Sequence, residues 1–132
     1  AKRSYLFLYK DVPPFLRKTS KSHEFSILSY GEDKFQHAKI NGCRTILKYF
    51  SKIIVTQNLD KSKEASELAR GKRAVLIEDN PDALSAVKKY APNIITVRIN
   101  RGAGRYSNIP SGSGVDYEVS GLGEVESIMS KL

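Results

Sequence analysis

The stretch AVLIEDNPDALSAV, residues 74–87, joins a short apolar run to an acidic pair and then to a helix start. The apolar run predicts a buried strand that ends at Glu78 and Asp79. Residues 80–82, Asn-Pro-Asp, predict the first turn of a helix, because proline is favoured at the first helical position. Acidic residues just past a buried strand typically hold a metal ion or receive a phosphoryl group. The stretch therefore predicts a strand-to-helix unit with chemistry at its junction.

The same alternation of apolar strands and helices runs through the whole chain. Continuous apolar strands separated by helices of about 10–15 residues indicate parallel strands with both faces of the sheet covered. We therefore expect an α/β fold of Rossmann type, a mostly parallel open sheet with helices on both faces. We expect it to form a single domain over residues 1–132, with no separate cap domain. The expected strands cover 5–9, 24–29, 52–56, 73–78 and 93–99, with a short last strand within 115–120, and the expected helices cover 12–19, 33–40, 44–50, 61–70, 81–91 and 122–132.

Composition and charge narrow the class of protein. The chain has 132 residues and a net charge of +8, from 22 basic and 14 acidic residues. A basic surface favours anionic partners such as phosphorylated ligands or nucleic acid, although a solvated basic face is the commoner explanation. The apolar runs are far shorter than the roughly 20 residues of a membrane span, so we expect no membrane partner. The single cysteine, Cys43, excludes an internal disulfide, and we expect a reducing, cytoplasmic location.

Polar residues follow the carboxyl ends of four successive expected strands. Ligands bind outside the carboxyl ends of the strands in an open parallel sheet, so we expect these side chains to converge on one rim. Hydroxyl and lysine groups donate to phosphoryl oxygens, and carboxylates bind Mg²⁺. Each residue alone has a simpler structural explanation, such as helix capping, and only the joint placement favours a site. The residues are Ser29, Tyr30 and Gly31 after the first of these strands, Thr56 and Gln57 after the second with Lys61 a few positions on, Glu78 and Asp79 after the third, and Arg98 and Asn100 at the end of the fourth.

The segments SYG, DK and IEDNPDAL, in this order, resemble the motifs of the haloacid dehalogenase-like phosphohydrolases. By this resemblance Ser29 matches the family's second motif, which bonds to the transferring phosphoryl group. Lys61 matches the third motif, a lysine that neutralises charge on the nucleophile and the phosphate, and Lys63 is the weaker candidate. Glu78 and Asp79 match the fourth motif, an acidic pair that holds Mg²⁺, and Asp79 is the expected main ligand.

The resemblance also gives a role to the neighbours of Ser29. Tyr30 and Gly31 follow it directly, and together with Ser29 and Lys61 they are expected to bind the phosphorylated substrate. For Tyr30, simple packing is the alternative. The catalytic residues implied by the resemblance are Ser29 and Lys61, and the implied partner is a phosphorylated small molecule or another anion.

The family's first motif, Asp-x-Asp at the end of the first strand, does not occur in these 132 residues. Its first aspartate is the nucleophile, and its second is the general acid/base. Two interpretations are open. The chain is truncated after this motif, which the sequence match favours, or the run YLFLY, residues 5–9, replaces the missing strand and leaves Asp11 near the motif's position. A gap in the middle of a sheet must be filled, so we expect residues 5–9 to form a strand between strands 24–29 and 73–78.

The resemblance thus implies a haloacid dehalogenase-like hydrolase core. The parent activity is Mg²⁺-dependent hydrolysis of phosphomonoesters through an aspartyl-phosphate. Without the nucleophile we expect little turnover and a Mg²⁺ site that is weak or lost. The alternative is a non-catalytic module that binds a phosphorylated ligand or nucleic acid through its basic surface. A phospho-acceptor receiver domain with Asp116 as acceptor is less favoured, because Asp116 precedes a short expected strand instead of following one.

Overall fold

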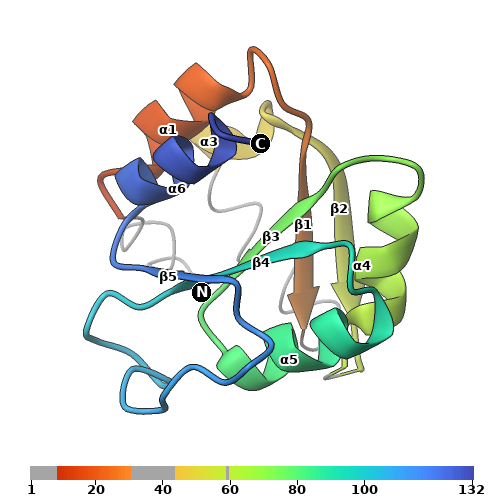
Figure 1. Ribbon diagram of the computed structural model, residues 1–132. Coiled ribbons are helices and arrows are strands. Elements are labelled where there is room, and N and C mark those ends of the chain that lie inside the picture. The colour runs from red at the N-terminus through yellow and green to blue at the C-terminus, as the bar shows by residue number, and fades with distance from the viewer. Residues whose placement is uncertain (1–8, 31–43, 59) are drawn as a thin grey trace. The chain divides into compact units, whose positions relative to one another are not determined.

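The computed structural model describes residues 9–30, 44–58 and 60–132. The chain divides into two compact units, Ala1–Leu59 and Asp60–Leu132, and each carries its own parallel sheet (Figure 1). The predicted α/β class with parallel strands is confirmed, since all strand pairs are parallel. The pairs are β1 (Phe25–Tyr30) with β2 (Phe50–Thr56), β3 (Val75–Glu78) with β4 (Ile95–Ile99), and β4 with β5 (Tyr117–Val119). A single domain over residues 1–132 stays a prediction.

The first unit builds a small core from aromatic side chains. Pro13 and Pro14 lie in the first helical turn of α1, where a missing N–H costs no hydrogen bond. The ring of Phe25 contacts the rings of Phe15 and Phe50 edge-on, with centroids 5.7 Å and 6.4 Å apart. These contacts pack α1 against β1 and β1 against β2. The elements of this unit are α1 (Val12–Thr19), β1 (Phe25–Tyr30), α3 (Arg44–Leu47) and β2 (Phe50–Thr56).

The helix predicted over residues 44–50 is wrong in its second half. Helix α3 ends at Leu47, the N–H of Tyr49 donates to the carbonyl of Ile46 at 3.1 Å, and Phe50 already belongs to β2. Phe50 pairs with Phe25 across the two strands, and their rings are in contact. This packing and the strand hydrogen bonds outweigh a local pattern that by itself fits a helix.

The second unit holds a three-stranded sheet in the order β3-β4-β5. Figure 1 shows α5 and α6 on opposite sides of this sheet. Its core consists of fully buried or nearly buried aliphatic side chains, among them Leu84 and Val87 of α5, Val97 of β4 and Val125 of α6. The elements are α4 (Ser62–Ala69), β3 (Val75–Glu78), α5 (Pro81–Tyr90), β4 (Ile95–Ile99), β5 (Tyr117–Val119) and α6 (Leu122–Met129).

The connection from β4 to β5 is anchored at its end by the buried Thr96. The Thr96 hydroxyl donates to the carbonyl of Gly114 at 2.6 Å and accepts the N–H of Asp116 at 3.0 Å. The Asp116 carboxylate in turn accepts the N–H of Thr96 at 2.9 Å and pairs with Lys88 of α5 at 2.6 Å. Asp116 therefore serves as a structural anchor ahead of β5.

Two expectations fall outside the part of the chain that the structure describes. These are the helix at 33–40 and the strand at 5–9, of which only Tyr9 is described. Both stay predictions. Among the described residues, no helix has the length and apolar character needed to cross a membrane.

Candidate functional site

The acidic pair lies where β3 ends and α5 begins, as predicted. Glu78 is the last residue of β3, and the exposed Asp79 follows it. Asn80 caps α5, because its side-chain oxygen accepts the N–H of Asp82 at 3.0 Å, and Pro81 opens the helix. Since β3, β4 and β5 are parallel, this junction belongs to the carboxyl edge of the second sheet.

Lys61 and Glu78 form an ion pair at this edge. The Lys61 Nζ lies 2.7 Å from Glu78 Oε1, and the side chains are only 15% and 14% exposed. The other carboxylate oxygen of Glu78 accepts the N–H groups of Asp79 at 2.8 Å and Asn80 at 3.2 Å. Both oxygens of Glu78 are thus engaged within the protein, so Asp79 is the carboxylate of the pair that faces solvent.

The start of α4 fixes the position of Lys61. Asp60 accepts the backbone N–H of Ser62 at 2.9 Å and also the Ser62 hydroxyl, which is buried. The pKa of Asp60 is lowered, above all by the hydrogen bond from the Ser62 hydroxyl. Lys61 therefore sits at a well-defined N-terminal turn, and its ammonium group reaches the end of β3.

The two carboxyl groups of the acidic pair differ in their affinity for a proton. A hydrogen bond with Glu78, partial burial and the nearby negative charge raise the pKa of Asp79 from 3.8 to about 6. Burial by itself raises the pKa of Glu78, but the hydrogen bonds from Asp79 and Lys61 and the charge of Lys61 outweigh it and lower that pKa to about 2. At neutral pH both groups are ionised, and the charge of Glu78 is balanced by Lys61.

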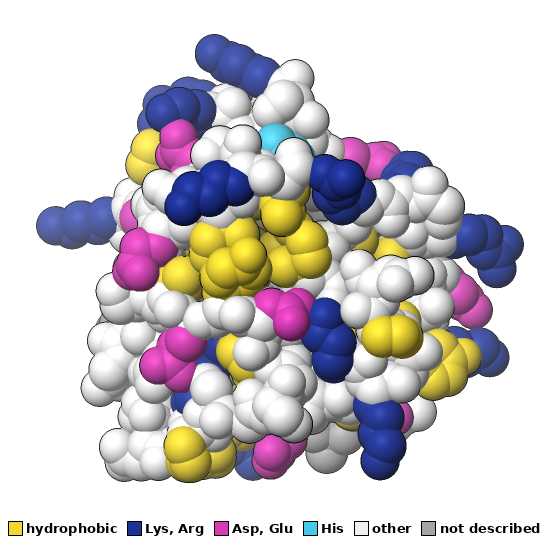
Figure 2. Space-filling view, viewed as in Figure 1, with side chains coloured by type: hydrophobic (Ala, Val, Ile, Leu, Met, Phe, Trp, Pro, Cys, Tyr) yellow, Lys and Arg dark blue, Asp and Glu magenta, His cyan; other side chains and the backbone are white. Residues whose placement is uncertain are grey.

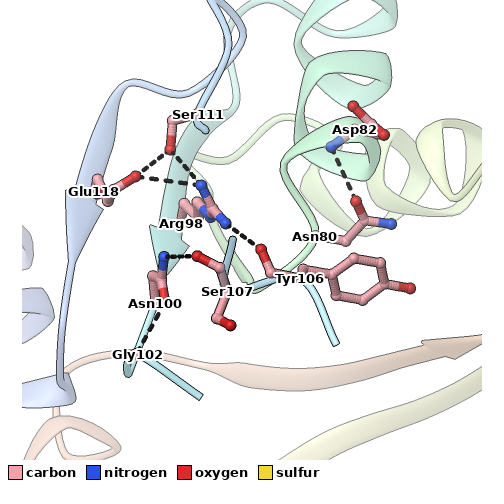
Figure 3. Close-up of polar contacts among 9 residues, drawn as sticks. All are labelled: Asn80, Asp82, Arg98, Asn100, Gly102, Tyr106, Ser107, Ser111 and Glu118. Carbon is pink, nitrogen blue, oxygen red and sulfur yellow. Dashed lines mark hydrogen bonds and ion pairs between the residues drawn. The ribbon is translucent and has the colours of Figure 1, made fainter. Parts of the chain in front are cut away.

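Arg98 occupies the position on β4 that pairs with Glu78 on β3, but its side chain does not face the rim. It is 1% exposed. Its guanidinium donates to the carbonyl of Tyr106 at 2.7 Å, to Ser111 at 3.1 Å and to Glu118 at 3.4 Å (Figure 3). The expectation that Arg98 contributes to the rim is therefore wrong. A buried guanidinium must find partners, and here it holds the loop between β4 and β5.

Asn100, two residues after Arg98, also holds the loop between β4 and β5. Its amide donates to the carbonyl of Ser107 at 3.0 Å, and its side-chain oxygen accepts the N–H of Gly102 at 3.0 Å (Figure 3). Gly102 has a φ of +79°, in the left-handed region that glycine adopts without strain. The loop that leaves the carboxyl edge is thus folded against its own strand.

The other expected site residues belong to the first unit. Ser29 and Tyr30 end β1 beside Val55 and Thr56 of β2, so they share the carboxyl edge of that sheet. Tyr30 is 43% exposed, which leaves its ring available to a ligand. Thr56 is buried, and its hydroxyl accepts the N–H of Asn58 at 3.1 Å. Gly31 lies outside the described residues, and Gln57 is exposed.

The edge of the second sheet carries two adjacent carboxylates, Glu78 and Asp79. In the described ranges no three His, Cys, Asp or Glu side chains gather into a cluster able to hold a metal ion. Asp79 is the exposed carboxylate, whereas Glu78 is engaged by Lys61. Mg²⁺ is commonly bound by one or two carboxylates together with substrate phosphates, so a single exposed aspartate is compatible with it only when phosphate completes the shell.

Comparison with solved structures identifies the fold. A haloacid dehalogenase-like hydrolase from Burkholderia xenovorans superposes with a TM-score of 0.75 at 20% identity, over 96% of this chain and 60% of that one. A dehalogenase with an intermediate complex gives a TM-score of 0.70 at 18% identity, over 91% and 55% of the two chains. The hydrolase YfnB from Bacillus subtilis, bound to magnesium, gives 0.68 at 15% identity, over 88% and 53%.

The chain has the haloacid dehalogenase-like hydrolase fold. It spans between 53% and 60% of the length of these three structures. No protein-family model and no curated protein matches the sequence. The resemblance that the motifs suggested is thus confirmed at the level of this fold.

The motifs missed two features near the acidic pair, and only one of them left a signal in the local sequence. The pairing of Lys61 with Glu78 joins residues 17 positions apart, and no local pattern announces it. The second is the Asx turn at Asp60, whose carboxylate accepts the N–H of Ser62 just ahead of α4; an aspartate before a helix start is a local signal for such a turn.

Proposed function

We propose that this chain is a haloacid dehalogenase-like hydrolase core that binds a phosphorylated ligand but turns it over poorly. The observation that carries the proposal is the Lys61–Glu78 ion pair beside the exposed Asp79. Both lie at the carboxyl edge of the second unit's parallel sheet. Ligands of open parallel sheets bind at that edge. The absence of an Asp-x-Asp motif from these 132 residues is the reason for the low turnover.

Each residue of the proposed site has a separate task. Lys61 donates one N–H to Glu78 and has two further N–H donors, which can bind phosphoryl oxygens. Glu78 holds the ammonium group of Lys61 in place, and the carboxylate of Asp79 is exposed to solvent. For the first unit, the prediction that Ser29, with its neighbours Tyr30 and Gly31, binds a phosphoryl group stays a separate proposal.

Asp79 is the residue that would hold Mg²⁺, with Glu78 as a secondary carboxylate. Mg²⁺, when bound, supplies positive charge that stabilises a phosphoryl oxygen. Glu78 is held by Lys61, so its contribution to the ion is small. We therefore expect Mg²⁺ to bind weakly in the absence of phosphate and more tightly in its presence.

Titration of inorganic phosphate into the chain, with and without Mg²⁺, tests the binding part of the proposal. Lys61→Met should lose most of the phosphate affinity, because the cation that faces the anion is gone. Asp79→Ala should keep phosphate binding and lose its enhancement by Mg²⁺. Lys63→Met is the matched control, since Lys63 is the exposed lysine two residues further on. Equal phosphate affinity in Lys61→Met and Lys63→Met would contradict the proposal.

Release of phosphate from a generic phosphomonoester tests the catalytic part. The chain should show little turnover with Mg²⁺, because no aspartyl-phosphate can form without the nucleophile, and that loss typically costs several orders of magnitude in rate. Fast turnover that Asp79→Ala abolishes would contradict the proposed incompleteness. Asp11 and Asp82 would then be the first nucleophiles to examine by substitution.

A non-catalytic module that binds nucleic acid through its basic surface stays the alternative prediction. A cytoplasmic location also stays a prediction. On the face drawn in Figure 2, Lys and Arg side chains protrude singly, with Asp and Glu side chains among them. Binding of nucleic acid to such a surface would weaken steeply with salt. A flat salt dependence would exclude that alternative.

A further inference from the structure

An open cavity of about 610 Å³ lies at the amino edge of the second sheet. One wall is the end of α4 and the turn that leads into β3, and the other is the end of α5 and the segment that leads into β4. Asp79 lies at the other end of β3, roughly 10 Å or more away, because a strand rises about 3.3 Å per residue. The lining residues are Ser66, Ala69, Arg70, Gly71 and Lys72 on the first wall, and Tyr90, Ala91, Pro92, Asn93 and Ile94 on the second.

The cavity is positively charged. Arg70 and Lys72 line it, and no carboxylate does. Arg73 and Lys89 are exposed and adjoin the lining residues in sequence. Within the described part of the chain, the side chains of Arg70, Arg73 and Lys89 have no ion pair. The carboxyl ends of α4 and α5 each contribute about −0.5 charge, which together offset roughly one of the cations that line or adjoin the cavity. A net positive charge remains for an anion.

The second wall presents an aromatic ring on a rigid support. Tyr90, in the last turn of α5, is 61% exposed, although burial of so large a ring is normally favourable. The segment that follows is fixed by Lys88, whose ammonium donates to the carbonyls of Pro92 at 3.2 Å and Ile94 at 2.6 Å. Lys88 is therefore occupied, and it holds the wall beside Tyr90 in place.

The first wall leaves space for a ligand to approach. Gly71 ends α4 with a φ of +68°, and a Cβ atom added there would meet nothing within 4 Å. The backbone at this turn is therefore accessible between the two cationic side chains Arg70 and Lys72. The cavity volume falls within the range of about 300–1,000 Å³ that is common for small-molecule sites.

We propose that this cavity binds a nucleotide, with the phosphate at Arg70 and Lys72 and the base stacked on Tyr90. Cationic side chains beside an exposed aromatic ring form the combination that recognises a phosphate and a planar base together. The site is separate from the carboxyl-edge site of the proposed function, and its occupation needs neither Mg²⁺ nor Asp79. The nucleotide is either free or part of a single strand, and the two sources share this chemistry.

The test is calorimetric titration of adenosine 5′-monophosphate into the full chain, in buffer that contains EDTA. Binding should be saturable, and adenosine or ribose 5-phosphate alone should each bind more weakly. Tyr90→Ala and Arg70→Ala should each weaken binding about fivefold or more, the effect of losing one stacked base or one phosphate contact. Both side chains are exposed, so the variants should melt at the temperature of the wild type, as circular dichroism will verify.

Matched controls separate this cavity from other sites. Tyr117→Ala removes an exposed tyrosine and Arg105→Ala an exposed arginine of the same unit, both outside the cavity, and neither should change the affinity. In Asp79→Ala and Lys61→Met, which disable the carboxyl-edge site, the saturable binding that Arg70→Ala and Tyr90→Ala weaken should persist. Loss of binding in these two variants, with Arg70→Ala unaffected, would place the nucleotide at the carboxyl edge and overturn the inference. Absence of saturable binding, or inorganic phosphate binding as tightly as the nucleotide, would overturn it as well.

A short oligoadenylate titrated in parallel identifies the source of the nucleotide. Tighter binding of the strand, with a steeper loss of affinity in salt, would point to nucleic acid. Equal affinity of the strand and the monophosphate would point to a free nucleotide. Either result supports the inference, provided that Tyr90→Ala and Arg70→Ala weaken it.

Discussion

The ammonium group of Lys61 lies 2.7 Å from the carboxylate of Glu78, and this pair links the start of α4 to the end of β3. Both groups are largely withdrawn from water, so neither is easily left without the other. The remaining oxygen of Glu78 accepts two backbone N–H groups from the turn that leads into α5. One carboxylate thus organises three consecutive elements around the proposed site.

Replacing Lys61 by methionine should destabilise the second unit by about 1–3 kcal/mol, because Glu78 is left charged and partly buried without its cation. Urea denaturation followed by circular dichroism at pH 7 measures this free energy. The control is Lys63→Met, whose side chain is exposed and should cost little. If both variants lose the same stability, the ion pair does not stabilise the unit.

Through Asp79, the stability of the protein should fall as the pH rises from about 4.5 to 6. The pKa of Asp79 is 3.8 in the unfolded chain and about 6 in the folded one, so in this window the folded state holds more protons. Glu78, whose pKa is 4.5 in the unfolded chain and about 2 in the folded one, has the opposite effect and offsets part of this decline below about pH 5. Asp79→Asn should remove the decline, so its stability relative to the wild type should rise between pH 4 and 6 and then stay level. A difference independent of pH would contradict this assignment.

Gly114→Ala should destabilise the second unit by about 1–3 kcal/mol, the usual cost of overpacking. An added Cβ atom would lie 2.4 Å from the Cα of Ser85, so the backbone of α5 or of the loop must move. Thermal or urea unfolding measures the effect. The control is Gly123→Ala in α6, where the Cβ atom meets open space and the helix gains up to about 1 kcal/mol. Similar stability of the two variants would show that the close approach to Ser85 is easily relieved.

Arg98→Lys should release the loop between β4 and β5. A lysine ammonium cannot reach the carbonyl of Tyr106, Ser111 and Glu118 in the way the forked guanidinium does. We expect a loss of about 2–4 kcal/mol in unfolding free energy. We also expect faster cleavage by trypsin after Arg101 and Arg105, read from the masses of the fragments. Arg73→Lys, at an exposed position, should show neither change. Unchanged cleavage at these two sites in Arg98→Lys would mean that other contacts hold the loop.

Several elements follow from local sequence alone. The proline pair before Phe15 predicts the start of α1, and Asn80-Pro81 predicts the start of α5, because these residues satisfy or dispense with the free N–H groups of a first turn. Gly71 predicts the end of α4 because it adopts a left-handed conformation. The apolar run of residues 74–77 predicts β3 and places the acidic pair at its end. These features depend on neighbours in the chain, so the sequence determines them.

Other features were decided only by the tertiary structure. Phe50 lies in a strand and not in the predicted helix, because its ring packs against Phe25 of β1, 25 residues earlier. The sequence predicted that Arg98 lies near the end of β4, and it does. Its side chain, however, is directed into the protein. There the guanidinium donates to Tyr106, Ser111 and Glu118, because a buried charged group needs partners. The sequence by itself determined where helices such as α1 and α5 begin and which polar residues stand at the strand ends. The tertiary structure determined which of these polar side chains face solvent, because that depends on partners distant in the chain.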